Sequence, residues 1–448
     1  MACDAARLTP VRRRAISDVP CGSAGSVVER FDQLPVRSER KGGLWVSAGA
    51  LWHFSDLDRV VAAPIPDLPA DSVRSVLEDR EGGIWLCAGA SGLMRMRAMH
   101  YRSLAVPEGL PSNNVKHVTQ DRAGNLWLGV QHEGVVRVSP DGSIKLQGPA
   151  EGAPVSDPTL VYSGRDGSVW AGFSAGLFVN RGQGWQPYSD FRFVRGVYED
   201  RQGALWIGTR SSGLVRIKDN VPAEIKLPSG EPIVRAAAFS EAPDGSLYIG
   251  TRTDGLYRFS EGRITPLNKE QGLPSNEVRD VHVDSEGNVW VGMRRRGLAL
   301  WLGDRWYNPE ELVNAVSHHV SAVYADAYDR LWIGSSAGVL WISRRDLIAA
   351  AREGRPIPPV HAITGTNDAL DVPVWSGGQP VVWPGSDGLL WFATRRGAIA
   401  VDPRAIEPNT VPPPVHVERV LVDRQEVKHA GGVVLPAGVR TLTVEYTG

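Results

Sequence analysis

Four arginines occupy the same place in a phrase that this chain repeats. Each stands four residues after an aromatic residue that begins a β-type run, and together they are Arg210, Arg252, Arg294 and Arg395. Another copy has Gln131 at this place, with His132 beside it. The planar guanidinium fork matches carboxylate and sulfate groups. If the copies superpose, these side chains form an incomplete ring, which predicts an anionic ligand such as a uronic or sulfated oligosaccharide.

Each of these features also has a structural interpretation. The arginines could instead pair with acidic neighbours such as Asp254 or Glu133. Trp306 follows one copy of the phrase, close to Trp301. Its ring could stack on a sugar, and the alternative is that it packs against the outer strand of its own repeat. Both interpretations stay open on the sequence alone.

The aromatic residue of the phrase recurs nine times, and its spacing indicates the structural units that position these residues. It is Trp45, Trp85, Trp127, Trp170, Trp206, Tyr248, Trp290, Trp332 and Trp391, and most intervals are 42 or 43 residues. A unit of this length suits a four-stranded propeller blade or a pair of helices. Each copy has short β-type runs separated by Gly, Asp and Asn turns, which favours strands. The chain is therefore predicted to be all-β, a β-propeller of four-stranded blades of about 42 residues.

The phrase itself is typical of a scaffold. Residues 121–129 read D-R-A-G-N-L-W-L-G, and residues 284–292 read D-S-E-G-N-V-W-V-G. The aspartate is expected to bind backbone amides in the turn between the first two strands, and the first glycine to supply a positive φ. We expect the tryptophan to pack between neighbouring sheets. The second glycine, two places after it, allows close backbone approach.

The repeat positions divide the chain into four parts. Residues 1–41 carry no repeat, 42–110 hold two blades left from a preceding propeller, and 111–405 form one seven-bladed propeller. A short helix is expected over 344–352, inside the longest interval. Residues 412–448, after three prolines, are predicted to begin a β-sandwich that stops before it is complete. Its expected strands are 415–422, 432–435 and 442–446.

Composition excludes several classes of function. The formal net charge is −1, with 49 basic and 50 acidic residues, so the chain is not expected to bind nucleic acid. Three cysteines are too few for a disulfide framework, and no spacing predicts a metal site, a cofactor or a catalytic residue. His318 and His319 are interpreted as surface residues of a connection, and Glu310 and Glu311 as a solvated pair in a loop. We find neither an apolar run long enough to cross a membrane nor a signal peptide.

At this point the pattern resembles a known family. The phrase V-x-x-V-x-x-D-x-x-G-x-L-W-x-G, followed by G-L-x-R, resembles the two-component regulator propeller repeat, over about residues 42–448. Residues 413–448, from P-P-V-H-V-E-R-V-L-V-D to L-T-V-E-Y, are similar to the start of the Tyr-rich immunoglobulin-like domain that follows such propellers. The family usually carries two seven-bladed propellers, this domain, a membrane helix and a kinase. This chain departs from it in having about nine blades and none of the later parts.

The resemblance implies a sensory function rather than catalysis. It predicts the ligand-sensing region of a two-component, hybrid-type sensor histidine kinase, at the periplasmic face of the inner membrane, with a small molecule or oligosaccharide as ligand. A homodimer through the C-terminal sandwich is also implied, and membrane attachment would need segments beyond residue 448. Two alternatives remain: a propeller-fold carbohydrate-active enzyme, and a non-functional fragment of a sensor kinase gene.

Overall fold

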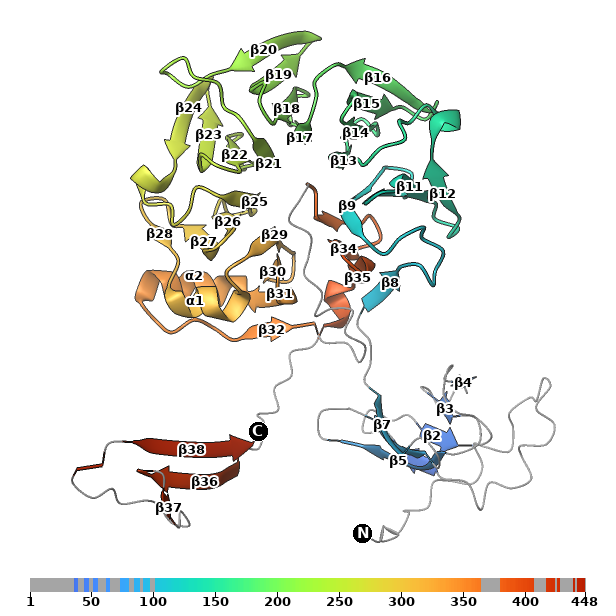
Figure 1. The fold of residues 1–448 in the computed structure, drawn as a ribbon, viewed down its shortest axis with the longest axis vertical. Helices are drawn as coiled ribbons and strands as arrows, with labels where there is room; N and C mark the ends of the chain where they lie inside the picture. The colour runs from blue at the N-terminus through green and yellow to red at the C-terminus, as the bar shows by residue number, and fades with distance from the viewer. Residues whose placement is uncertain are drawn as a thin grey trace, which may run out of the picture. The chain divides into compact units, whose positions relative to one another are not determined.

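A computed structural model describes residues 101–363 and 379–406 without interruption. Of the rest it describes 36–38, 44–47, 51–54, 62–64, 73–79, 84–88, 92–96, 416–423, 425–427, 438–439 and 441–447. Within the unit Met99–Ile406, seven four-stranded antiparallel sheets are arranged in a ring (Figure 1). The predicted β-propeller is confirmed.

Each sheet is one blade, and in the first six blades its strands run in chain order from the inside of the ring to the outside, as A, B, C and D. Blade 1 contains β9 (Val115–Gln120), β10 (Leu126–Val130), β11 (Gly134–Val138) and β12 (Ile144–Gln147). Blade 2 contains β13 (Leu160–Ser163), β14 (Val169–Phe173), β15 (Gly176–Asn180) and β16 (Trp185–Ser189). Blade 3 contains β17 (Val194–Glu199), β18 (Leu205–Thr209), β19 (Leu214–Lys218) and β20 (Val221–Ile225).

The remaining blades follow the same order. Blade 4 contains β21 (Ala236–Glu241), β22 (Leu247–Thr251), β23 (Leu256–Ser260) and β24 (Arg263–Leu267). Blade 5 contains β25 (Val278–Val283), β26 (Val289–Met293), β27 (Gly297–Trp301) and β28 (Trp306–Tyr307). Blade 6 contains β29 (Val320–Ala325), β30 (Arg330–Ser335), β31 (Gly338–Ser343) and β32 (Val360–Ala362). Blade 7 contains β33 (Val382–Pro384), β34 (Leu390–Thr394) and β35 (Gly397–Val401), completed by β8 (Tyr101–Leu104).

The repeated aspartate links the A–B turn to the blade aromatic. In the first blade, one carboxylate oxygen of Asp121 accepts the amides of Ala123 and Asn125, both at 2.9 Å. Its other oxygen accepts the indole Nε1–H of Trp127 at 2.8 Å. The indole ring lies edge-to-face with Trp185 of the next sheet, with ring centroids 5.6 Å apart, so the aspartate fixes both the turn and the wedge between blades. The same indole-to-aspartate bond, at 2.8–3.0 Å, joins Trp85 to Asp79, Trp206 to Asp200, Trp290 to Asp284 and Trp332 to Asp326.

Three aromatics follow a different turn. Trp170, Tyr248 and Trp391 come after a bare Asp-Gly, and the place of the linking aspartate holds Gly164, Ala242 or Gly385. The turn keeps its shape, since the amides of Gly167, Gly245 and Gly388 still bond back to these residues. Among the described residues, nothing accepts the buried Nε1–H of Trp391.

The second glycine of the phrase brings neighbouring blades together. A Cβ at Gly208 would lie 2.2 Å from the carbonyl oxygen of Ala236, on the first strand of the next blade. Real Cβ atoms do not approach this closely, so the strand can lie here only because residue 208 has no side chain. This agrees with the close approach expected from the sequence.

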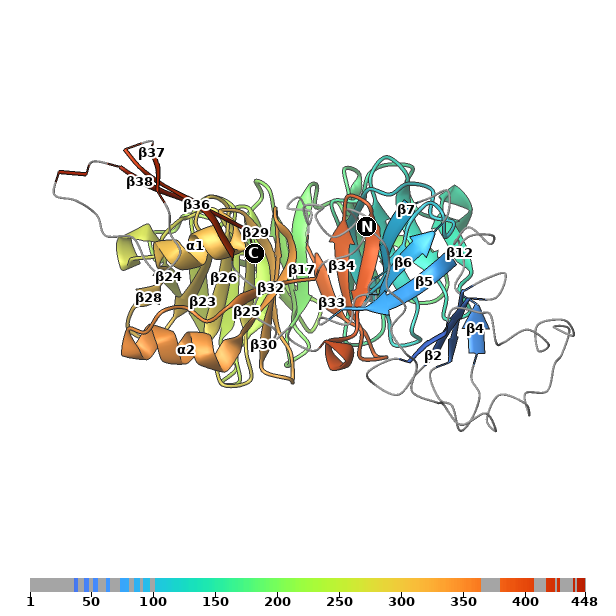
Figure 2. The same ribbon diagram turned by 90° about the horizontal axis from the view of Figure 1, so that it is seen from below.

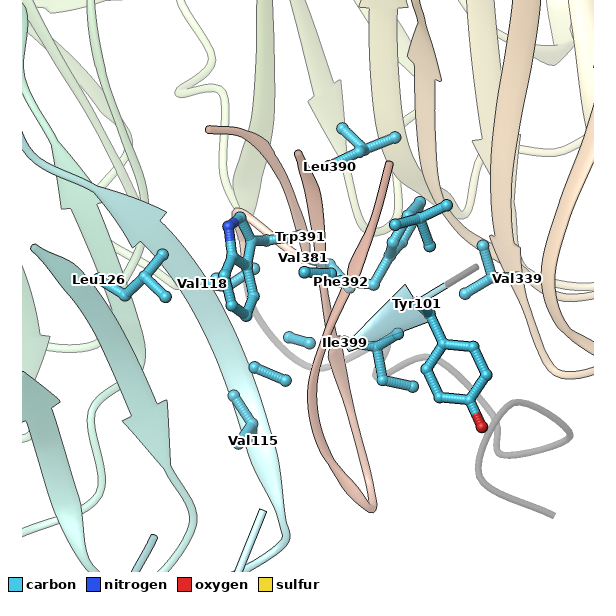
Figure 3. Close-up of a cluster of buried hydrophobic side chains, with 14 of the residues drawn as sticks. Tyr101, Val115, Val118, Leu126, Val339, Val381, Leu390, Trp391, Phe392 and Ile399 are labelled. Carbon is cyan, nitrogen blue, oxygen red and sulfur yellow. The ribbon is translucent and has the colours of Figure 1, made fainter. Parts of the chain in front are cut away.

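A strand from the start of the unit closes the ring. The sequence analysis assigned Tyr101–Leu104 to the two preceding blades, but the strand pairs with β35 as the outer strand of blade 7. Tyr101 is buried with Val381, Phe392 and Ile399, as Figure 3 shows. The physical reason is the free edge that β35 would otherwise present, which a strand from the other end of the ring covers.

Two helices lie in connections of the ring. The expected helix is present as α2 (Arg344–Glu353), with the Ser343 hydroxyl accepting the amide of Asp346 at its start and Gly354 at φ 67° after its end. A second helix, α1 (Glu310–Val316), begins where the sequence suggested a loop. Its acidic first turn complements the helix dipole. Figure 2 shows α1 and α2 at opposite faces of the ring, α1 where D strands cross to the next A strand and α2 where C connects to D.

The flanking segments form further sheets. β1 (Val36–Ser38), β2 (Leu44–Ser47), β3 (Leu51–Phe54) and β4 (Ala62–Pro64) make one four-stranded sheet, and β5 (Val73–Glu78), β6 (Ile84–Ala88) and β7 (Gly92–Met96) make a three-stranded one. Toward the end of the chain, β36 (His416–Val422) pairs with β37 (Gln425–Val427) and β38 (Leu442–Thr447). β36 and β38 match two expected strands, β37 was not foreseen, and 432–435 lies outside the described residues.

Candidate functional site

The residue four places after the blade aromatic occupies an equivalent place in five blades. Its backbone N–H donates to the carbonyl of a residue that precedes strand A in the same blade. The bonds run from Gln131 to Asn114, Arg210 to Phe193, Arg252 to Arg235, Arg294 to Glu277 and Ser336 to His319, at 2.9–3.2 Å. These positions therefore superpose as the sequence analysis assumed, on the face that carries the B–C hairpins and α1.

The arginines at this position form an arc rather than a ring. Arg210, Arg252 and Arg294 follow the B strands of the adjacent blades 3, 4 and 5, whereas Arg395 belongs to blade 7. Blade 6 has Ser336 here. The positive charge predicted for the whole face is thus concentrated on three neighbouring blades.

One of these arginines has an acidic neighbour, as the alternative interpretation expects, although the acid is neither Asp254 nor Glu133. Arg294 lies near Glu277, with Nε 3.8 Å from a carboxylate oxygen, and Arg295 approaches the same carboxylate at 3.8 Å. Asp254 instead accepts the hydroxyl of Thr253 at 2.9 Å. At 3.8 Å the Glu277 contacts are attractions between charges and not hydrogen bonds.

On blade 1 the polar groups satisfy one another. The side-chain amide of Asn114 donates to Gln131 at 2.6 Å. Asp157 accepts the backbone N–H of His132 at 2.5 Å and the ammonium of Lys116 at 3.1 Å. Gln131 and His132 thus lie on the predicted face, but they belong to a network that is closed within the protein.

Trp306 lies elsewhere. It is in β28, the outer strand of blade 5, and its ring centroid is 5.0 Å from that of Trp301. Both rings are partly buried against the core of their blade. The structure therefore places Trp306 at the outside of the ring, apart from the arginines (Figure 1).

Sequence reasoning missed the arginines nearest the centre of the ring. Arg195 and Arg279 lie in the innermost strands β17 and β25, each at a bulge where the register with strand B shifts. A bulge redirects a side chain out of the regular alternation. Lys116 has the same place in β9, and Arg235 precedes strand A of blade 4 with its N–H bound to the carbonyl of Thr209. A signal was available, since Lys116, Arg195 and Arg279 each stand eleven residues before the blade aromatic.

We call Arg195, Arg210, Arg235, Arg252, Arg279 and Arg294 the arginine arc. Arg195, Arg252 and Arg279, its inner members, are partly buried, whereas Arg210, Arg235 and Arg294, its outer members, are exposed. Burial lowers the pKa of Arg195, and the nearby charges of Arg210 and Arg235 lower it further.

The other inner members show the same electrostatic strain. Burial lowers the pKa of Arg252 to about 9, assisted by Arg279 and Arg195 and opposed by Asp280. The pKa of Arg279 is also lowered by burial, with a contribution from Arg294. The guanidinium group of Arg252 is therefore close enough to those of Arg195 and Arg279 to be repelled by both, in surroundings poor in water.

His319, on blade 6, lies within this positive field. Its backbone pairs with that of Arg294 in an isolated β-bridge. Burial lowers the pKa of its imidazole to about 4, with further contributions from Arg279, Arg294 and Arg252. The sequence analysis interpreted His319 as a surface residue, but it is partly buried beside the arc, whereas His318 is exposed.

Other kinds of site find little support in the part of the chain that the structure describes. There, no group of three or more His, Cys, Asp or Glu side chains is placed to hold a metal ion. Within the same residues, no helix is both long enough and apolar enough to span a membrane.

Comparison with protein families identifies the repeat. Residues 109–132, 190–211 and 272–295 match the family model described as "Two component regulator propeller". The three segments contain strands A and B of blades 1, 3 and 5, together with the residues that lead into strand A. The sequence has no significant match among curated proteins.

Solved structures share the fold. The extracellular domain of the putative hybrid two-component system BT3049 from B. thetaiotaomicron aligns with a TM-score of 0.63 and 16% identity, over 92% of this chain and 56% of that one. The extracellular domain of BT4673 from the same organism, described as a putative one-component or hybrid two-component system, aligns in two structures with TM-scores of 0.53 and 0.54. Identity is 14% and 13%, over 88% of this chain and 54% or 55% of that one. This chain thus spans just over half the length of these structures.

Proposed function

We propose that this chain, which carries two-component regulator propeller repeats, is a ligand-sensing extracytoplasmic region of a two-component sensor. The repeats and the propeller fold support the sensory role. The observation that carries ligand binding is the arginine arc, which places six guanidinium groups on three adjacent blades of one face. The ligand binds on this face, where the B–C hairpins and D–A crossovers meet.

An anionic oligosaccharide is the ligand class that we propose. Arginine forks bind carboxylate and sulfate oxygens through paired hydrogen bonds. Hydroxyl-rich sugars also need polar partners, and the exposed Ser336 supplies a hydroxyl group at the place in blade 6 that the arginines hold in blades 3, 4 and 5. No observation favours an enzyme, since the described part of this face carries no pair of free carboxylates placed for acid–base work.

Signalling is tested by giving the sensory region an output. Residues 1–448 are joined to the membrane helix and kinase of a two-component sensor whose extracellular domain has the same fold, and a reporter gene is placed under that kinase. We expect acidic oligosaccharides to change reporter expression, whereas neutral ones of equal length do not. A reporter that responds to none of a broad set of oligosaccharides, while the fusion is present and folded in the membrane, argues against the sensory role.

A further inference from the structure

The arginine arc gathers six positive charges on three adjacent blades. Among the described residues, the carboxylates that act on its inner members are Asp280, beside Arg252, and Glu277, beside Arg279. The whole chain has a net charge of −1. Such local accumulation is costly in a partly buried place, because each charge loses solvation and repels its neighbours.

Both acids are shared with groups other than the inner arginines. The two carboxylate oxygens of Asp280 accept the backbone amides of Val281 at 3.0 Å and Val323 at 2.8 Å. Glu277 interacts with Arg294 and Arg295 at 3.8 Å, and one of its buried oxygens has no hydrogen-bond partner among the described residues. Each acid therefore offsets one inner arginine, Arg252 or Arg279, while it also serves the backbone or an outer arginine.

Two side chains of the inner part also keep unused hydrogen-bonding capacity. Within the described residues, the buried Nε of Arg279 and the buried Nε2 of His319 meet no hydrogen-bond partner. Across the same residues, the side chain of Arg195 has no ion pair or hydrogen bond, and the neighbouring charges that lower its pKa are those of Arg210 and Arg235. Buried donors normally have partners, so an acceptor supplied by a ligand would satisfy the Nε–H of Arg279 and, in the tautomer protonated at Nε2, the imidazole of His319. The same group would pair with the charge of Arg195.

We propose that an anionic group of a ligand binds between Arg195 and Arg279, beside Arg252 and His319, and that a second anionic group of the same ligand contacts the outer arginines Arg210, Arg235 and Arg294. The ligand class is a small molecule with at least two carboxylate or sulfate groups, such as an acidic oligosaccharide. This inference deepens the proposed function and rests on it for the role of the ligand as a signal. The binding site itself rests on the arc.

The position of the arc favours a compact ligand over a polymer. β17, β21 and β25 lie side by side at the inner edge of the ring (Figure 1), and the inner arginines belong to or adjoin these strands. A nucleic acid is bound by basic side chains spread along a path that neutralises successive phosphates. Here the charge converges toward the centre of one face.

The experiment measures binding by the full chain with calorimetry and thermal unfolding. The probes are sodium sulfate, a uronic-acid trisaccharide, its sulfated counterpart and a neutral trisaccharide. We expect both acidic trisaccharides to bind and raise the unfolding temperature, sulfate to bind at least tenfold more weakly, and the neutral sugar not to bind. Arg195→Gln and Arg279→Gln should each weaken binding of the acidic trisaccharides at least tenfold, whereas Arg263→Gln, on the exposed outer strand of blade 4, should not.

A second readout separates a ligand site from a structural cluster. Without ligand, Arg195→Gln should unfold at the same temperature as the unmodified chain or higher, because it removes a repelled charge. Loss of unfolding temperature in both glutamine variants without ligand would show that the cations support the fold, and would overturn the proposal. Failure of every acidic probe to bind, or binding that both variants retain, would overturn it as well. Binding without a response of the kinase fusion would refute the sensory role and leave the site intact.

Discussion

Trp290 donates its indole N–H to Asp284 at 3.0 Å, and the same carboxylate oxygen accepts Arg344 from the following blade at 2.9 Å. Arg344 is the first residue of α2 and also pairs with Glu286 at 2.8 Å. The carboxylate of Asp284 therefore both stabilises the A–B turn of blade 5 and joins blade 5 to Arg344 of blade 6. Asp121 holds the corresponding place in blade 1, where its recorded contacts stay within the turn and Trp127.

We expect Asp284→Ala to destabilise the propeller more than Asp121→Ala. The first substitution removes the acceptor of the indole and of the turn amides, and it leaves the buried Arg344 with one ion-pair partner fewer. Loss of one partner from a buried pair costs about 3–5 kcal/mol, against about 1–3 kcal/mol for unsatisfied turn and indole donors. Urea unfolding followed by tryptophan fluorescence measures both variants, and equal losses would contradict the special role of Arg344.

The same contact has a pH dependence of known sign. Burial opposes ionisation of Asp284, but the hydrogen bonds from Trp290, Asn288 and Arg344 outweigh it and hold its pKa below the ordinary 3.8. A carboxylate with a lowered pKa stabilises the folded state above 3.8, and this contribution is lost as the pH falls through the folded-state pKa. The Asp284→Ala variant should therefore approach the unmodified chain in stability under strongly acidic conditions, below pH 3.8.

Much of the fold could be predicted because its units repeat. The aromatic period located the B strands, and the glycines and aspartates located the turns. The closing strand could not be located, because Tyr101–Leu104 carries no signature that distinguishes a partner in its own repeat from one about 300 residues later. Closure is decided by the free edge of β35, which is a property of the assembled ring.

The site was predicted in part for the same reason. Repeat phase identified the face and the place of Arg210, Arg252 and Arg294, because these residues stand at fixed distance from the aromatic. It did not identify Arg195 and Arg279. They share a place eleven residues before the aromatic, but the β-bulges that direct their side chains form only when the strands pair. Nor did it show that Trp306 lies in an outer strand, since aromatic residues serve packing and stacking equally well.

Removal of the closing strand should open the ring. A chain that starts at residue 107 lacks β8, so the outer edge of β35 would be unpaired. Apolar side chains that are buried with Tyr101, including Ile399, would become exposed. We expect a lower urea midpoint and concentration-dependent association on size-exclusion chromatography. A chain that starts at residue 99 retains β8 and is the matched control. If both chains remain monomeric and equally stable, β8 does not close the propeller.

His117 should make the propeller sensitive to mild acid. Burial lowers the pKa of its imidazole to about 3, with smaller contributions that include Lys116 and Arg195, from an ordinary value of 6.5. The unfolded chain therefore takes up a proton that the folded chain refuses, and stability present above pH 6.5 falls as the pH decreases toward 3. The loss attributable to this residue is about 1.4 kcal/mol per pH unit at most.

Natural substitutes for His117 occur within the chain. The residue that faces the strand-B glycine is Leu160 in blade 2, where His117 faces Gly129 in blade 1. His117→Leu should therefore fold, and its stability relative to the unmodified chain should rise as the pH falls below 6.5. Urea midpoints across that range measure the difference. Because His282 and His319 also have lowered pKa values, only the difference between the two proteins reports on His117, and parallel profiles would contradict the prediction.

Asp280 should act in the opposite direction. Burial raises the pKa of its carboxyl from 3.8 to about 7, although the amides of Val323 and Val281 and the charge of Arg252 favour ionisation. The folded chain then holds a proton that the unfolded chain has released, so its stability falls as the pH rises from 3.8 to about 7. Asp280→Asn and Asp280→Ala remove this titration, and Ala238 and Ala322 at the same place in adjacent blades show that alanine fits. Both variants should therefore gain stability relative to the unmodified chain across that range, by about 1.4 kcal/mol per pH unit at most, and with the same slope despite different offsets. If the stability profiles of the variants run parallel to that of the unmodified chain, Asp280 is ionised in the folded chain across this pH range. Its carboxylate would then offset the charge of Arg252.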